Sequence, residues 1–145
     1  MAYILGLNAY HGDSSACLIH DGKLIAAVEE ERFRRIKHWA GFPSKSIEYC
    51  LSEAGITLSD VDHIAINQDA KANLWKKIGF TLAKRPELSF VLDRLKKKSE
   101  RVGVLDELAQ TVSGEFKGKL HQVEHHLAHL SSAFHVSPFE KAVVV

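Results

Sequence analysis

The sequence has little of what marks secreted or membrane-spanning proteins. Only two of its 145 residues are cysteines, and they form no CxxC pair, so we expect no disulfide framework. No apolar run approaches the roughly 20 residues of a bilayer-spanning helix. The first apolar segment, Tyr3–Leu7, fits a strand better than a signal peptide, and no basic stretch precedes it. We therefore expect a reduced, cytoplasmic protein without a membrane span.

A strong net charge is absent as well. Lysine and arginine number 19 against 18 aspartate and glutamate residues, a formal charge of +1 that gives no overall attraction to nucleic acid or membranes. A local exception is the segment from Lys71 to Arg101, which contains ten basic residues and only three acidic ones. We interpret residues 70–102 as a solvated helical insertion, with a basic interaction surface as the alternative.

Most familiar catalytic motifs are also missing. The sequence contains no nucleophile elbow, no phosphate-binding P-loop and no glycine fingerprint for dinucleotides. A zinc-protease helix needs glutamate directly after its first histidine, whereas His126 follows His125 here. The general base of that enzyme class is therefore absent.

The first thirty residues predict three short strands in a meander. The strands are Tyr3–Leu7, Ser15–Ile19 and Lys23–Glu29, and Asp21–Gly22 is a two-residue hairpin turn between the last two. Residues 8–14, which join the first two strands, are mostly polar or small. Such a loop exposes backbone N–H groups and hydroxyls that can cradle an anion.

The following segments predict an α/β domain. Pro43 and Ser44 open a helix that runs to about Ala54, Gly55 ends it, and residues 61–67 alternate like a strand. The resulting order β-β-β-α-β is typical of an α/β fold with a mixed sheet. Further along we expect a helix over 105–113, a strand over 119–123, a helix over 125–135 and a last strand from about residue 141.

The predicted helix over 125–135 carries a histidine pair. His125 and His129 are four residues apart, so their imidazoles lie on the same helix face and can point at one ion. His126 sits about 100° further round the helix and cannot easily join them. Two histidines need a further protein ligand, often a carboxylate, to hold a catalytic ion. Spacing alone leaves surface histidines as the alternative.

Two further candidates lie nearer the N-terminus. His11 stands in the loop of small residues and can act as a general base near neutral pH, with Asp13 to orient it or to bind a metal. A turn rich in hydrogen bonds is the alternative for both. Lys37 lies in a basic segment and can hold phosphate or carbamoyl oxygens as a point charge, with an ordinary surface lysine as the alternative.

Several spaced motifs occur together in this order. They are Ile4-Leu5-Gly6-Leu7-Asn8, His11-Gly12-Asp13-Ser14-Ser15-Ala16, Asp21-Gly22, Ala26-Ala27-Val28-Glu29-Glu30-Glu31-Arg32-Phe33, Lys37-His38, Gly41-Phe42-Pro43 and His125-His126-Leu127-Ala128-His129. This arrangement resembles the amino-terminal region of the carbamoyltransferase family of nodulation-factor and antibiotic-biosynthesis enzymes. The resemblance covers residues 1–145 apart from the basic stretch.

The resemblance implies an actin-like ATPase (ribonuclease H-like) lobe related to tRNA threonylcarbamoyladenosine transferases. The family carries out ATP-dependent O-carbamoylation, in which carbamoyl phosphate and ATP give carbamoyladenylate in a second, carboxy-terminal domain. The actin-like domain then transfers the carbamoyl group to a small-molecule hydroxyl acceptor. No membrane or nucleic-acid partner is expected, and a homodimer is compatible with the family.

Matched positions carry expected roles. His125 and His129 would be ligands of a divalent metal, expected to be iron(II), and His11 would sit at the transfer centre. Lys37 would contact the carbamoyl or phosphate group. The residues expected on the ATP or carbamoyladenylate side are Asn8, Asp13 and Ser14.

Two departures from the family pattern limit these expectations. Many relatives have aspartate directly after the loop histidine, whereas Gly12 intervenes before Asp13 here. The family's next metal ligand, an aspartate, would come just beyond Val145. We therefore expect an amino-terminal portion, incomplete at the carboxy-terminus and inactive in isolation. The alternatives are a truncated non-catalytic or interaction module, and a relative of the tRNA threonylcarbamoyladenosine-type transferases.

Overall fold

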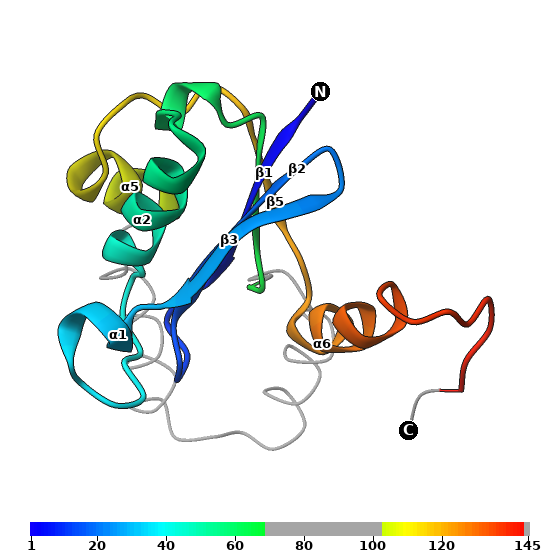
Figure 1. The fold of residues 1–145 in the computed structure, drawn as a ribbon. Coiled ribbons are helices and arrows are strands. Elements are labelled where there is room, and N and C mark those ends of the chain that lie inside the picture. Colours follow the sequence, from blue (N-terminus) through cyan, green and yellow to red (C-terminus); the bar gives the residue numbers. More distant parts are fainter. Residues whose placement is uncertain (69–102, 144–145) are drawn as a thin grey trace, which may run out of the picture.

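A five-stranded mixed sheet organises the chain. The computed structural model describes residues 1–68 and 103–143, and the strand order is β3-β2-β1-β4-β5 (Figure 1). The predicted α/β class, the order β-β-β-α-β and the mixed sheet are confirmed. The helical insertion expected over 70–102 lies outside the described residues.

Three antiparallel strands form half of the sheet, as the sequence predicts. They are β1 (Tyr3–Asn8), β2 (Ser15–His20) and β3 (Lys23–Glu29). Asp21 and Gly22 both have positive φ, 48° and 78°, which is the backbone of a type I′ hairpin turn. This turn matches the twist of the two strands that it joins, so the β2–β3 pairing follows from local sequence.

Two parallel strands complete the sheet. β4 (His63–Ile66) pairs with β1, and β5 (Lys119–Gln122) pairs with β4. β4 is shorter than the predicted strand over 61–67, because a 3-10 turn at Leu58–Asp60 precedes it and Val61 closes that turn.

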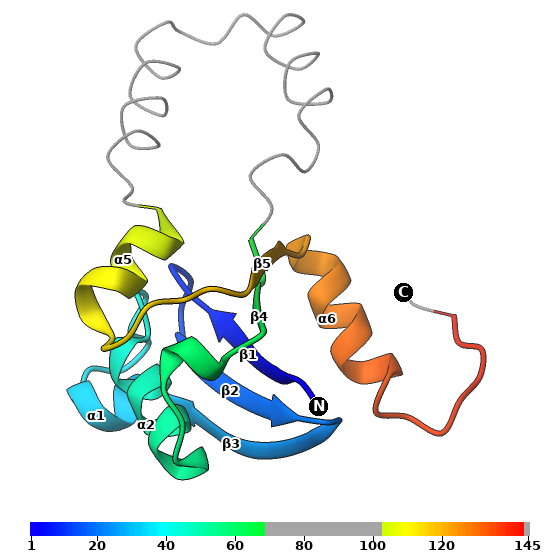
Figure 2. The ribbon, with the colours of Figure 1, turned by 90° about the horizontal axis from the view of Figure 1, so that it is seen from above.

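Two helices cover one face of the sheet and enclose the core. α2 (Ser44–Ala54) and α5 (Val104–Thr111) lie together on that face in both ribbon views (Figures 1 and 2). Gly55 ends α2 in the left-handed conformation, as predicted. The largest fully buried apolar side chains of the core are Leu5, Leu18, Ile47, Leu58, Ile64, Ile66 and Leu108. Alternate residues of each strand face these helices, which explains the period-two pattern in the sequence.

A buried carboxylate fixes the start of α2. Glu30 has no exposed area, and its oxygens accept hydrogen bonds from the backbone N–H groups of Lys45 (3.3 Å) and Ser46 (2.8 Å). Arg34 donates to the same carboxylate at 2.7 Å and stacks over the ring of Trp39, 4.4 Å from its centroid. Arg34 belongs to a short helix, α1 (Glu31–Arg34), which the sequence analysis did not predict.

The last helix, α6 (His125–Phe134), lies on the opposite side of the sheet from α2 and α5 (Figure 2). Its N-cap is Glu124, whose side chain accepts a hydrogen bond from the backbone N–H of Leu127. The predicted helix over 125–135 is thus confirmed, although none of its residues is buried.

The strand expected from about residue 141 is wrong over the described residues. Ala142 and Val143 have no regular structure, and Val143 is 92% exposed. An apolar run becomes a strand only when its backbone pairs with a neighbour, and this segment lies outside the five-stranded sheet. None of the helices in the described ranges is long and apolar enough to cross a membrane.

Candidate functional site

The loop between β1 and β2 is shaped by side-chain amides. Asn8 donates from Nδ2 to the carbonyl oxygens of Gly12 (3.4 Å) and Asp13 (2.9 Å), and its Oδ1 accepts from Asn67 at 2.7 Å. Both ends of the Asn8 side chain are therefore occupied in holding the loop. Direct contact of Asn8 with a nucleotide stays a prediction.

Ser14 ties this loop to the segment that precedes α2. Its side chain is fully buried, and its hydroxyl lies 2.7 Å from the carbonyl oxygen of Gly41 and 3.2 Å from that of His11. The backbone N–H of Ser14 donates to the carbonyl of Trp39 at 2.9 Å. The structure thus places the Ser14 hydroxyl inside the scaffold, and its expected nucleotide contact stays a prediction.

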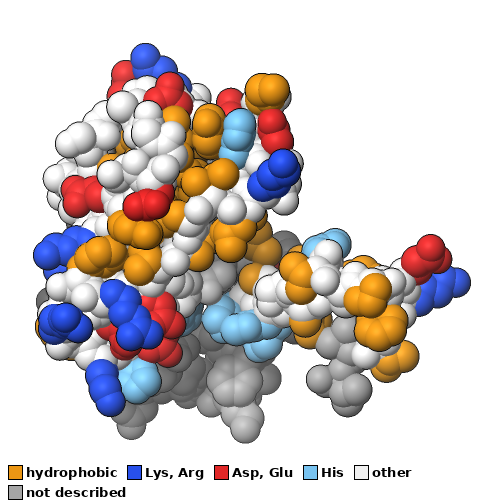
Figure 3. All heavy atoms as spheres, in the orientation of Figure 1, with side chains coloured by type: hydrophobic (Ala, Val, Ile, Leu, Met, Phe, Trp, Pro, Cys, Tyr) orange, Lys and Arg blue, Asp and Glu red, His pale blue; other side chains and the backbone are white. Residues whose placement is uncertain are grey.

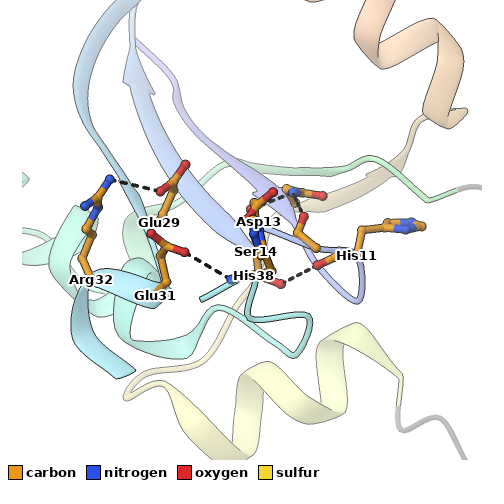
Figure 4. Close-up of polar contacts among 9 residues, drawn as sticks. His11, Asp13, Ser14, Glu29, Glu31, Arg32 and His38 are labelled. Atoms are coloured by element: carbon orange, nitrogen blue, oxygen red, sulfur yellow. Dashed lines mark hydrogen bonds and ion pairs between the residues drawn. The ribbon is translucent and has the colours of Figure 1, made fainter. Parts of the chain in front are cut away.

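Asp13 is paired with a histidine 25 residues away. One carboxylate oxygen of Asp13 lies 2.8 Å from Nδ1 of His38, and the backbone N–H of His38 donates to Glu31 (Figure 4). The hydrogen bond and charge of Asp13 raise the pKa of His38, and the charges of Glu31 and Glu29 add to this effect. The Lys37-His38 motif does not by itself identify His38 as the partner of Asp13, because the two residues are 25 positions apart.

Removing the Asp13 carboxylate is expected to lower the pKa of His38 toward its ordinary value. A raised folded-state pKa means that the pair stabilises the fold below the unfolded pKa of histidine and loses this effect as the pH rises through the folded pKa. The measurement is an NMR pH titration of the His38 imidazole in wild type and Asp13→Asn. Glu31→Gln serves as the control and should lower the pKa less. An unchanged His38 pKa in Asp13→Asn would contradict the pairing.

The two histidines predicted as metal ligands face each other. The Nε2 atoms of His125 and His129 are 3.2 Å apart, with ring centroids separated by 4.6 Å. Nitrogen ligands lie about 2.0–2.1 Å from zinc-like ions, so two on one tetrahedral ion are separated by roughly 3.3 Å. Nδ1 of His125 is buried and has no hydrogen-bond partner among the described residues. The pair has the geometry of a bidentate site, and metal binding itself stays a prediction.

His11 reaches the same place from the β1–β2 loop. Its ring centroid lies 4.9 Å from that of His125. Histidine side chains gather where α6 joins the rest of the molecule (Figure 3). Together with Asn8, Gly12, Ser15, Asn67, Ala128 and Ser132, the three histidines line a cavity of about 620 Å³. The structure therefore brings His11 together with His125 and His129, which lie more than 110 positions further along the sequence.

Other predicted residues lie outside this cavity. Lys37 is exposed on the segment between α1 and α2 and is not among the residues that line the cavity. Across residues 1–68 and 103–143, no three His, Cys, Asp or Glu side chains are arranged to hold one ion. A metal at the histidine pair would need further ligands from elsewhere.

His126 does not line the cavity, as helix geometry predicts, although its ring meets that of His125 edge-on at a centroid distance of 5.8 Å. It is exposed, and its Nδ1 lies 2.9 Å from a carboxylate oxygen of Glu124. This hydrogen bond, together with that from the backbone N–H of Leu127, lowers the pKa of Glu124 to about 2. The helix therefore separates the histidines into a facing pair and a partner for the N-cap.

A larger groove adjoins the histidine cavity. It has a volume of about 1010 Å³ and runs between α6 and the sheet face that α2 and α5 leave open. Small side chains shape it, including Gly6, where a Cβ atom would come within 2.7 Å of Cys17 Sγ. The residues shared by the groove and the cavity are Asn8, Ser15, Asn67, Ala128 and Ser132. The two spaces are thus continuous.

The fold and site define an α/β domain with a histidine-lined cavity between the β1–β2 loop and α6. Comparison with known proteins then gives the family. A protein-family model described as "Carbamoyltransferase N-terminus" matches residues 3–145. The chain therefore belongs to the carbamoyltransferase family and corresponds to the amino-terminal part of its members. The expected resemblance is confirmed.

Two relatives extend this assignment. The uncharacterized protein sll1178 of Synechocystis is 39% identical over 154 residues, which cover 100% of this chain and 25% of that protein. The nodulation protein NolNO of Sinorhizobium fredii is 37% identical over 139 residues, which cover 95% of this chain and 19% of that protein. The chain thus spans a quarter or less of each relative's length.

Two solved structures are also similar to this chain. YeaZ from Pseudomonas aeruginosa is 22% identical with a TM-score of 0.36 and covers 57% of this chain and 40% of its own. An uncharacterized protein with similarity to peptidase YeaZ from Pseudomonas aeruginosa is 18% identical, with a TM-score of 0.44. It covers 92% of this chain and 49% of its own length.

Proposed function

We propose that the chain is the amino-terminal portion of the actin-like domain of an ATP-dependent O-carbamoyltransferase. In this proposal a carbamoyl group passes from carbamoyladenylate, made from carbamoyl phosphate and ATP, to a small-molecule hydroxyl. The observation that supports this best is the convergence of His11 and the His125–His129 pair on one cavity in a member of this family.

The histidine pair fits a divalent metal, expected to be iron(II). Both Nε2 atoms converge, and imidazole nitrogen suits iron and other first-row divalent ions. When bound, the metal would supply Lewis-acid stabilisation of phosphate oxygens on the leaving nucleotide. The remaining ligands would come from residues outside the described ranges or from the nucleotide itself.

His11 is proposed to take the proton of the acceptor hydroxyl. Its loop is anchored at both ends, by Asn8 and by the buried Ser14. The His11 imidazole is therefore held beside the His125–His129 pair, where it can act as a general base. Lys37 would contact phosphate or carbamoyl oxygens as a point charge, although it does not line the cavity. Asp13 is a carboxylate that only accepts hydrogen bonds, so on the nucleotide side it would act through a bound metal ion. This role would compete with the bond from Asp13 to His38.

A graft tests the proposed function. In the graft, this chain replaces the matching segment of sll1178, which is 39% identical. The graft is incubated with ATP, carbamoyl phosphate and a panel of sugar and aminoglycoside acceptors, and carbamoylated product is measured by mass spectrometry. We expect product from the graft and none from the 145-residue chain alone. His11→Ala in the graft should abolish product, whereas His126→Ala should leave it unchanged.

Three outcomes would contradict the proposal. Product from the parent protein sll1178 without product from a folded graft would exclude the transferase role of this chain. Full activity of His11→Ala would exclude the role of that imidazole. If the graft binds tRNA tightly but does not bind carbamoyl phosphate, a function like that of the tRNA-modifying relatives is favoured instead.

A further inference from the structure

A second pair of facing imidazoles lies on the parallel half of the sheet. Nδ1 of His63 on β4 and Nε2 of His121 on β5 are 3.2 Å apart, with ring centroids separated by 5.1 Å. Neither residue lines the histidine cavity or the adjoining groove. The proposed transferase function makes no use of this pair.

The backbone sets the separation of these two rings. The strand register places His63 opposite Lys119 and Ala65 opposite His121, so the histidines are diagonal neighbours on one face of the sheet. Hydrogen bonds from Lys119 N to Asp62 O (2.9 Å) and from Val123 N to Ile66 O (2.8 Å) hold β5 against β4 at both ends. Two short side chains on a paired backbone can therefore meet without a large entropic cost.

The face that carries the pair is accessible. Ile64 and Ile66 point into the core, so His63 and His121 project from the opposite face of the strands. His63 is half-buried and His121 is exposed. An ion and its water ligands can therefore reach both nitrogen atoms from solvent.

The separation of the two nitrogens suits one ion. With metal–nitrogen distances of about 2.0–2.1 Å, two imidazoles at angles between about 90° and 110° have nitrogens roughly 2.9–3.4 Å apart. Without an ion the two rings can share one hydrogen bond, whereas two protonated rings repel each other. Coordination satisfies both lone pairs at once.

The donor atoms also decide the class of ion. Imidazole nitrogens suit borderline transition metals such as Zn²⁺, Ni²⁺ and Cu²⁺, whereas Ca²⁺ and Mg²⁺ require oxygen ligands. Within the described part of the chain no third His, Cys, Asp or Glu completes the site. Water would fill the remaining coordination positions.

We propose that His63 and His121 form a bidentate site for a divalent transition-metal ion of the zinc class, which ties β5 to β4. β5 is the last strand in the sheet order and leads directly into α6, the helix that carries His125 and His129. An ion at this site stabilises the strand from which α6 departs. The proposal is independent of the proposed transferase function.

Zinc titration of the 145-residue chain tests the site. The double variant His125→Ala/His129→Ala is used as background, so that the other histidine pair cannot bind the ion. We expect zinc to shift the imidazole signals of His63 and His121 in NMR spectra and to raise the melting temperature. Calorimetry should show that His63→Ala or His121→Ala weakens zinc binding about tenfold or more, since one of two ligands is lost.

His135→Ala in the same background is the matched control. His135 is exposed and lies at the C-terminal end of α6, outside β4 and β5, so this substitution should leave zinc affinity unchanged. Amide spectra in zinc-free buffer establish that each variant is folded. Should a variant fail to fold, the site-resolved shifts in the background protein decide alone. Zinc shifts confined to other histidines, or equal affinity in both single variants and the control, would overturn the proposal.

Discussion

Glu30→Ala is expected to lower the free energy of unfolding by about 3–5 kcal/mol, as breaking a buried ion pair typically does. The substitution leaves Arg34 without its 2.7 Å partner and removes the acceptor for the first backbone N–H groups of α2. It also frees the hydroxyl of Ser46, which donates to Glu30 at 2.9 Å. Urea denaturation followed by circular dichroism measures the change.

Glu48→Ala is the control for this experiment, because Glu48 is an exposed residue of the same helix. Surface substitutions of this kind usually change stability by no more than about 0.5 kcal/mol. Glu30→Gln should fall between the two, since the amide oxygen can still accept one bond but the charge opposite Arg34 is lost. Equal midpoints for Glu30→Ala and Glu48→Ala would show that the buried network contributes little.

The second large effect is expected at the histidine cavity. His125→Ala and His129→Ala should each weaken binding of Co²⁺ or Fe²⁺ at α6 by about tenfold or more, because either change leaves a single imidazole ligand. The site-resolved readout is the metal-induced shift of the remaining imidazole in NMR spectra. This readout separates the pair from any binding elsewhere on the chain.

His126→Ala is the matched control for the cavity, since His126 does not line it and its Nδ1 pairs with Glu124. None of the three substitutions should unfold the protein, because α6 contains no buried residue. Metal shifts that persist at full strength in both His125→Ala and His129→Ala would exclude this pair as a chelating site.

Local structure was largely predictable from local sequence. The first strand over Tyr3–Leu7, the Asp21–Gly22 turn and the end of α2 at Gly55 each depend on immediate neighbours, and each appears as predicted. Such features depend on side-chain direction and backbone preference, which sequence displays directly. The apolar run near the end of the described chain was misjudged because a strand also needs a partner.

The site was only partly predictable. Helix periodicity places His125 and His129 on one face and His126 elsewhere, so the facing pair needed no tertiary information. Glu30 lies in the charged run Glu29-Glu30-Glu31-Arg32, whose burial the sequence pattern does not predict, yet this glutamate is fully buried. Its burial depends on Arg34 and on the N-terminus of α2, which the chain brings to it only when folded.

The sequence by itself therefore determined the α/β class, the meander, the helix that carries the histidine pair and the family. Tertiary structure alone decided which distant residues meet: His11 with His125, Asp13 with His38 and His63 with His121. The physical reason is that periodicity specifies the direction of a side chain within its own element. Contacts between elements depend on strand order and register, which are set by packing of the whole core.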